Sequence, residues 1–375
     1  MKIRNLLAVL AALVIVGGIY IFAVSRPDDA RGAITVWYVE GGTMSDEFVA
    51  LAAGYNKSIS RASLPVQCVP FADEDAMAAA FDTQAPDLVL CSHYRAFDMY
   101  ARGKLTDISA ALGDNAPDYP RALSSRSACI GASYFPVGAE VQVLFVNTAL
   151  TAGRDLTTLE ALSAAAEEYR SETDKPFYAA ADYAQLFFTE YLREGEEFDA
   201  ASAARSSKVY KHIYNLLAEN AYTGALSLTS GDEVSAVSAG ELGCAVVGTT
   251  ALPKKLGRGV SVLPVPPLTS AGGEGALGEA WGLAVVARGS RSTGDISAFL
   301  AWLFSSNRDT RLALQTQLIP ARTSSLITRD ALWSALIALN TGEIVALPSA
   351  EVSDFSVNRA DFERDIRARL AFLAQ

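Results

Sequence analysis

Histidine is nearly absent from this chain of 375 residues, which contains only His93 and His212. Imidazole is a common zinc ligand and the usual general base of Ser-His-Asp and Cys-His enzymes, so such sites have few options here. A G-x-S-x-G motif, which marks the nucleophile of the α/β hydrolases, does not occur either. The sequence therefore predicts no catalytic site of these kinds, no metal site and no bound cofactor.

Cysteine is scarce as well. The chain has four cysteines, Cys68, Cys91, Cys129 and Cys244, and no C-x-x-C pair, so zinc and redox motifs are disfavoured. Each cysteine lies in or beside an apolar stretch with the length of a strand, which predicts a small buried side chain. A disulfide such as Cys68 to Cys91 is the alternative for an exported chain.

Positive charge is in deficit. Lys and Arg number 31 against 42 Asp and Glu, which gives a formal net charge of −11 and a pI of about 4.8. A nucleic-acid backbone would be repelled, so no nucleic-acid partner is expected. The length suggests about two domains, each large enough to bury its own core.

The longest apolar run covers residues 6–24, follows two basic residues and ends at residues 26–29. It is longer than the ~7–15 residues of a signal-peptide core and suits the ~17–25 residues of a membrane-spanning helix. The charge pattern places the amino end in the cytoplasm and the rest outside. We predict a signal or transmembrane segment with linker at 1–32, preferably an uncleaved anchor. Cleavage after Ser25, which would give a periplasmic or secreted protein, is the alternative.

Apolar patterns and turn residues predict an α/β protein in which strands and helices alternate, as in a parallel sheet covered on both faces. The expected strands are 34–39, 65–71, 86–91, 129–135, 141–147, 177–181, 244–248, 260–264 and 281–286. The expected helices, besides one through Phe48 and Tyr55, are 73–81, 93–101, 157–170, 182–192, 200–219, 249–256, 296–304, 309–316, 330–339 and 359–373.

Polar residues before three of these helices predict their caps. Thr43 or Ser45 precedes the helix through Phe48, and Thr157-x-x-Glu160 has the spacing of a capping box. Thr249 and Thr250 are the expected cap of the helix that reaches residue 256.

Two groups of motifs carry a resemblance to a known family. Within residues 279–322 a W-G-hydrophobic strand, an F-L-x-W-L-F helix and an I-P-A-R close follow in order. Near the amino end come I-T-V-W, a helix with Y-N near its end, P-D-L-V and a G-x-L-x-D-I piece at 103–108. The set, spanning about residues 33–340, resembles the family 1 extracellular solute-binding proteins of ABC importers, which include maltose- and oligosaccharide-binding proteins. Phe145-Val146-Asn147 departs from the Tyr-Tyr-Asn of the family, which puts aromatic stacking there in doubt.

The resemblance implies a two-lobed fold of the periplasmic-binding-protein type (type II) with hinge strands. We expect lobe I at 33–146 plus 281–320 and lobe II at 147–280 plus 321–375. Such lobes close on a small solute by a hinge motion, and the closed form docks on an ABC transporter permease. The implied ligand is a sugar or oligosaccharide, and the expected protein is an exported monomer that is not an enzyme.

Ligands of an open parallel sheet bind beyond the carboxyl ends of its strands. This rule selects the four loops that follow the expected strands 34–39, 86–91, 177–181 and 244–248, and the resemblance adds the loop at 278–281. Sugars stack their ring faces on aromatic side chains and pair their hydroxyls with polar groups. The candidate ligand-binding residues are Glu40, Gly41, Gly42, Thr43, Ser92, Tyr94, Asp182, Tyr183, Thr249, Glu279 and Trp281. Each also has a structural interpretation, such as a helix cap for Asp182 or strand packing for Trp281. Arg322 is interpreted as part of a structural ion pair.

Other functions stay open. An acidic rim also suits a polyamine or another small organic cation, whereas ferric iron is disfavoured because an adjacent tyrosine pair is absent. An exported glycan hydrolase that uses two carboxylates is a hypothesis from a different class, because acids are plentiful. A sensory ectodomain would have the same sequence features as a transport protein.

Overall fold

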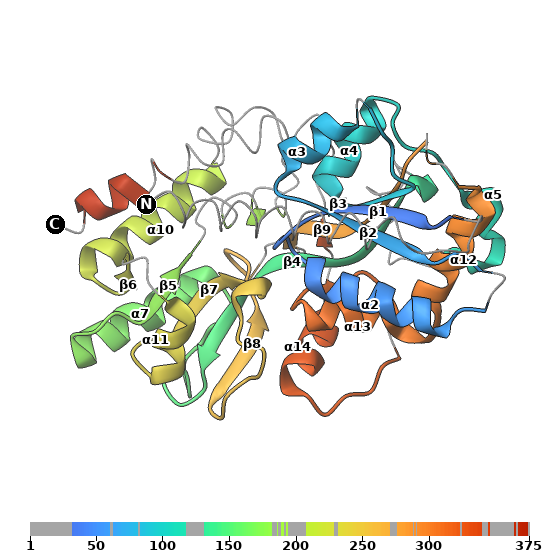
Figure 1. The fold of residues 1–375 in the computed structure, drawn as a ribbon. Helices are drawn as coiled ribbons and strands as arrows, with labels where there is room; N and C mark the ends of the chain where they lie inside the picture. The colour runs from blue at the N-terminus through green and yellow to red at the C-terminus, as the bar shows by residue number, and fades with distance from the viewer. Residues whose placement is uncertain are drawn as a thin grey trace, which may run out of the picture.

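The structure is a computed structural model with two α/β lobes on either side of strand β4 (Tyr134–Asn147) (Figure 1). It describes residues 32–60, 63–81, 83–117, 131–181, 186, 189–190, 193, 208–228, 232–270, 276–287, 289, 291–322, 325–339, 344–345, 364 and 367–373. No helix in this part of the chain is long and apolar enough to cross a membrane, and the anchor expected at 1–32 lies almost wholly outside it.

The first lobe is a sheet with helices on both faces. Its strands run in the order β2-β1-β3-β9-β4, with the first three parallel and β9 antiparallel to both β3 and β4. Their bounds are Ile34–Val39 for β1, Val66–Phe71 for β2, Leu88–Ser92 for β3 and Ala276–Val285 for β9. One face packs on α2 (Ser45–Ser58), α5 (Ser109–Leu112), α12 (Thr293–Phe304) and α13 (Arg308–Gln315), and the other on α3 (Glu74–Ala80) and α4 (His93–Ala101).

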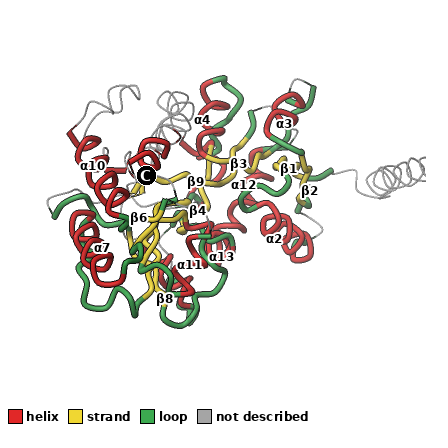
Figure 2. Tube along the Cα trace, turned by 90° about the vertical axis from the view of Figure 1, so that its left-hand side faces the viewer, coloured by secondary structure: helices red, strands yellow, loops and turns green. Residues whose placement is uncertain are grey.

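The second lobe is built in the same way around the other half of β4. Strands β7, β5 and β6 continue the sheet on one side of β4, and β8 pairs with β4 on the other. Their bounds are Tyr178–Ala180 for β5, Leu226–Ser227 for β6, Cys244–Gly248 for β7 and Val260–Pro264 for β8. Helices α7 (Leu159–Thr173) and α10 (Lys208–Thr223) cover one face, and α11 (Glu233–Ala239) lies on the other (Figure 2). Helix α14 (Ala331–Leu339) packs on the same core as α11.

Short elements complete the described fold. Strand β10 (Ile319–Pro320) pairs with β4, and β11 (Ile344–Val345) pairs with β9. The 3-10 turns are η1 (Gly113–Asn115), η2 (Gly131–Ser133), η3 (Thr249–Ala251) and η4 (Ser305–Asn307).

Strand β4 joins the two lobes. Its residues from Tyr134 to Val141 pair with β9, and those from Gln142 onward pair with β7. The prediction of two strands separated by Pro136-Val137-Gly138 is wrong. The structure has one continuous strand, and the extra residue is absorbed as a bulge where the register shifts between Pro136 and Gly138.

Most predicted elements of the described chain are present, and β1, β7, β8 and α4 have the predicted bounds. Three capping predictions are wrong. Helix α2 follows Met44 in a left-handed conformation, and the Ser45 hydroxyl donates to the Val39 carbonyl instead of capping. Thr158, not Thr157, caps α7, and the helix expected at 249–256 is only the single turn η3. Of the helix expected at 182–192, only residues 186, 189 and 190 are described, and of that at 359–373 only residues 364 and 367–373; all of these are helical.

Cys68, Cys91 and Cys244 are free thiols, so the alternative disulfide from Cys68 to Cys91 is wrong; Cys129 lies outside the described residues. Cys91 and Cys244 are fully buried, and burial raises the pKa of both thiols far above the ordinary value. Burial also raises the pKa of Cys68, to about 11. All three thiols are therefore protonated and weakly reactive at neutral pH.

Two glycines test the packing at β4. A Cβ on Gly282 would overlap the Phe135 carbonyl oxygen, so Gly282→Ala forces the backbones of β4 and β9 apart. We expect a loss of about 3 kcal/mol or more in the free energy of unfolding. Gly54, in α2, has open space where a Cβ would lie, so Gly54→Ala should stabilise by about 0.5–1 kcal/mol. Urea unfolding measures both, and equal stability of the two variants would contradict the close approach.

Candidate functional site

The strand register brings loops of both lobes to the crossing strands β4 and β9. Ser92, at the end of β3, lies opposite Trp281, and Trp281 lies opposite Gly138 on its other side. Glu279 lies opposite Glu140 in β4, and two residues further on Gln142 lies opposite Gly248, the end of β7. The carboxyl ends of β3 and β7 therefore lie on either side of one short stretch of the paired strands β9 and β4.

Glu279 is a half-buried carboxyl whose neighbours are mostly acidic. Burial, with smaller effects of the facing Glu140 and of Glu74 at the start of α3, raises the pKa of Glu279 from 4.5 to about 7. A hydrogen bond from the Ser92 hydroxyl opposes this rise. A carboxyl with a pKa shifted this far, placed where strand ends converge, is typical of a functional site.

Glu140 is the member of this site that the sequence patterns did not indicate. Its Oε1 accepts a hydrogen bond from the Thr250 hydroxyl, just after β7. The same oxygen lies 2.5 Å from the point where a Cβ on Gly248 would be, so Gly248 leaves the space that the carboxylate occupies. In the sequence, Glu140 directly precedes the strand expected at 141–147, and a carboxylate at that place was equally compatible with simple exposure to solvent.

Aromatic residues flank the two glutamates. Trp281 is half-buried and packs on the core under α2 and α12, and its buried Nε1 has no hydrogen-bond partner among the described residues. Tyr94 belongs to α4 of the first lobe yet packs against the core of the second, beside His93 at 3.9 Å between ring centroids. His93 is buried, and its Nδ1 accepts the Ala280 N–H at 3.0 Å, so this nitrogen carries no proton.

The remaining predicted site residues are placed differently. Glu40 and Gly41 are exposed, and Gly42 and Thr43 are half-buried. None of these four residues is among the groups that shift the pKa of Glu279. Gly41 has a φ of 70°, which explains a glycine in the turn. Thr249 is fully buried, and its hydroxyl has no partner among the described residues. Asp182 and Tyr183 lie outside the described residues, next to Ala181, whose N–H bonds to Val246 of β7.

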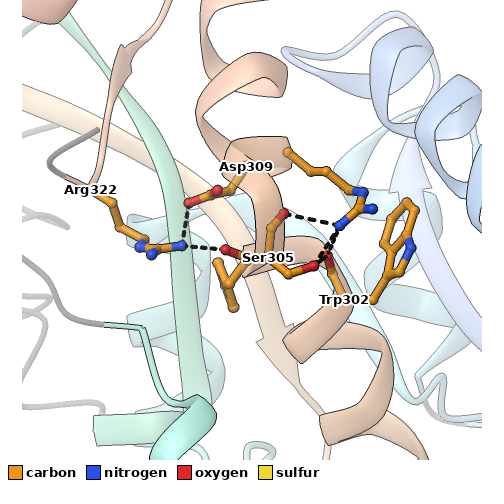
Figure 3. Close-up of polar contacts among 6 residues, drawn as sticks. Trp302, Ser305, Asp309 and Arg322 are labelled. Carbon is orange, nitrogen blue, oxygen red and sulfur yellow. Dashed lines mark hydrogen bonds and ion pairs between the residues drawn. The ribbon is translucent and has the colours of Figure 1, made fainter. Parts of the chain in front are cut away.

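Arg322 forms a structural ion pair, as predicted. Its Nη1 donates to Asp309 Oδ2 at 3.1 Å and to the Phe304 carbonyl at 2.9 Å, tying β10 to α13 and the end of α12 (Figure 3). Asp309 is buried, and burial raises its pKa while the Arg322 charge opposes the shift.

A cavity of about 450 Å³ lies elsewhere, between α11 and strands β5 and β6. Asp232, Glu233 and Glu241 contribute to its lining, and none of the predicted site residues does. In the described part of the chain no group of three or more His, Cys, Asp or Glu side chains is placed to hold a metal ion.

Comparison with known proteins identifies the family. The sequence profile of the bacterial extracellular solute-binding proteins matches residues 69–307, which is more than half of the chain. The chain therefore belongs to this family, whose members are solute-binding components of ABC importers. No curated protein matches the sequence.

Solved structures share the fold. The cyclic alpha-maltosyl-1,6-maltose binding protein of Arthrobacter globiformis has 20% identity and a TM-score of 0.69, over 92% of this chain and 94% of that one. The GacH receptor of Streptomyces glaucescens, solved without ligand and with acarbose, has 20% identity and a TM-score of 0.64 over the same shares. UgpB of Mycobacterium tuberculosis, in complex with glycerophosphocholine, has 18% identity and a TM-score of 0.67, over 92% and 97%. The resemblance seen in the sequence motifs and the two-lobed α/β fold are thus confirmed.

The structural role of Arg322 makes a prediction. Arg322→Ala leaves the buried Asp309 carboxylate without its cation, which typically costs about 3–5 kcal/mol of stability. The matched control is Arg102→Ala, which removes an exposed pair with Asp98 and should cost at most about 1 kcal/mol. Chemical unfolding compares the two variants. A solute affinity that drops in Arg322→Ala while its stability stays unchanged would contradict the structural assignment.

Proposed function

We propose that this protein binds a small carbohydrate or oligosaccharide where β4 and β9 cross, and delivers it to the permease of an ABC importer. The observation that supports the site most strongly is the strand register. It brings Ser92 of β3 and Glu279 and Trp281 of β9 next to Glu140 of β4, whose carboxylate accepts a hydrogen bond from Thr250 after β7.

The chemistry of these residues suits a sugar. The indole of Trp281 offers an apolar face, and the two glutamates offer oxygens that accept hydroxyl protons. The Trp281 Nε1 and the Thr249 hydroxyl are buried without a partner in the described chain, so a ligand that supplies their hydrogen bonds would lower the free energy of the bound state. The names of two structural relatives, a cyclic maltosyl-maltose binding protein and an acarbose receptor, agree with a carbohydrate.

The two lobes are proposed as 33–146 plus 281–320 and 147–280 plus 321–375, with β4 and β9 as the hinge. Closure over the solute then brings Tyr94 of α4 and the loop after β7 together, and the closed form is what the permease recognises. Residues 1–32 are proposed as the membrane anchor or signal segment that places the lobes outside the cytoplasm. We further propose that the protein is a monomer, and that Glu40, Gly41, Gly42, Thr43, Asp182 and Tyr183 complete the ligand contacts.

Two alternatives have specific support. A polyamine or another organic cation would match the acidic surroundings of Glu279. A glycan hydrolase is favoured by one observation only, the two facing glutamates of which one has a raised pKa, as in carboxylate-pair enzymes. Chromatography of maltotriose after incubation with the full chain distinguishes binding from turnover, because only an enzyme changes the sugar.

A pair of tryptophan variants tests the site. Both Trp281 and Trp302 are half-buried and pack against the same core of the first lobe, but Trp302 lies on α12, outside the proposed site. Trp281→Ala should weaken binding of the best sugar from a panel of maltose, maltotriose and galactose by about tenfold or more, the loss of a stacked aromatic anchor. Trp302→Ala should lower thermal stability yet keep the affinity.

Calorimetric titration of the full-length protein measures both affinities. Equal affinity of Trp281→Ala and wild type would remove Trp281 from the site. Failure of every sugar to bind, with binding of spermidine, would replace carbohydrate by polyamine as the solute class.

A further inference from the structure

Glu140 and Glu279 face each other across β4 and β9 at the point where β4 changes from one sheet to the other. Side chains directly opposite in an antiparallel pair have Cβ atoms about 5 Å apart, and like charges at that separation are destabilising. Each carboxyl has its own hydroxyl donor, because Thr250 donates to Glu140 and Ser92 to Glu279. These hydroxyls come from different lobes, so the pair lies between two loops that closure would bring together.

The surroundings of the pair do not neutralise it. In the described part of the chain neither glutamate forms an ion pair with a lysine or arginine, and the charged group that also acts on Glu279 is Glu74 of α3. His93 faces the same stretch from α4, but its Nδ1 accepts the Ala280 N–H and therefore brings no positive charge. A carboxyl directly opposite a second carboxyl in the register, partly removed from water and without a cation, holds its proton more tightly than an isolated one.

A second observation points to a ligand here. The fully buried Thr249 precedes Thr250, and its hydroxyl has no partner among the described residues. The Trp281 Nε1, two residues beyond Glu279 in β9, is also buried without one. Buried polar atoms normally have a partner, so a ligand bound at the crossing of β4 and β9 would find in these atoms groups that need a hydrogen bond.

We propose that Glu279 holds a proton beside the facing Glu140, and that an uncharged solute binds most tightly to this protonated form. The proposal rests on the proposed function only for the solute. The retention of the proton on Glu279 is a property of the protein alone. A bound sugar removes further water from both carboxyls, so ionisation of Glu279 becomes more costly in the complex than in the free protein. Binding therefore takes up a proton from solution when Glu279 has lost it in the free protein.

The direction of the pH dependence follows from linkage. The pKa of Glu279 in the folded protein is raised to about 7 from 4.5, so the folded state holds the proton more tightly than the unfolded chain. The contribution of protonated Glu279 to the free energy of unfolding is fully present below pH 4.5. It is lost as the pH rises from 4.5 to about 7, and it changes no further above pH 7. Affinity for a neutral solute is constant below about 7 and weakens above it, by at most about tenfold per pH unit for one proton.

The first experiment needs no ligand. Urea unfolding of the full-length wild type and of Glu279→Gln is measured between pH 5 and 8, because the amide imitates the protonated carboxyl. Wild type should lose stability relative to Glu279→Gln as the pH rises to about 7, whereas Glu241→Gln, at an exposed position after α11, should follow wild type. Parallel profiles of wild type and Glu279→Gln would overturn the retained proton on Glu279, whatever the solute is.

The second experiment measures calorimetric affinity for maltotriose between pH 5.5 and 8.5 in buffers of different ionisation enthalpy. We expect the affinity of wild type to fall by about tenfold per pH unit above pH 7 with uptake of up to one proton, and a flat profile for Glu279→Gln. A flat wild-type profile, or an affinity that rises with pH, would overturn the proposal but leave solute binding intact. If no sugar binds at any pH, the proposed function fails, and the unfolding profiles still decide whether Glu279 retains its proton.

Discussion

The structure depends on one continuous strand that belongs to two sheets. Strand β4 pairs with β9 up to Val141 and with β7 from Gln142, so the backbone hydrogen bonds of both lobes converge on neighbouring residues. An extended strand has alternate side chains on opposite faces, and Val141 and Val143 on one face are buried in the core while Glu140 on the other is only half-buried. The junction of the lobes is therefore the place where the sheet presents polar side chains to loops instead of to covering helices.

Two acids of this chain, the buried Asp309 and the half-buried Glu279, show what such a position means energetically. Asp309 is compensated by Arg322, whose guanidinium also donates to the Phe304 carbonyl, so its charge serves the fold. Glu279 has a hydroxyl for a partner and two further acids as neighbours, and its pKa is raised to about 7. An uncompensated carboxyl costs stability, and proteins keep such groups mainly where a ligand or proton uses them.

Most helices and strands could be predicted from the sequence, because apolar periodicity and turn residues define them locally, and the two-lobed fold was expected from the family resemblance. β1, β7, β8 and α4 agree in both bounds with the structure. Local chemistry was less predictable: Ser45 bonds to the carbonyl of Val39 across the turn, and Pro136 stays within β4 because a bulge absorbs it. Glu140 was not among the predicted site residues for a related reason. Its role depends on the register with β9 and on the missing side chain of Gly248, and both are long-range properties that no local pattern contains.

The central claim is that the lobes move together when a solute binds at β4 and β9, and a distance between the lobes tests it most directly. Spin labels at Tyr100→Cys on α4 and Tyr222→Cys on α10 occupy exposed positions of the two lobes, and Cys68, Cys91 and Cys244 react slowly because their pKa values are raised. With Cys129 replaced by serine, pulsed electron resonance reports the distance in the full-length protein. The account predicts a shift to shorter distances on addition of a sugar that binds, and no shift with a sugar that does not. An unchanged distance distribution at saturating solute would contradict it.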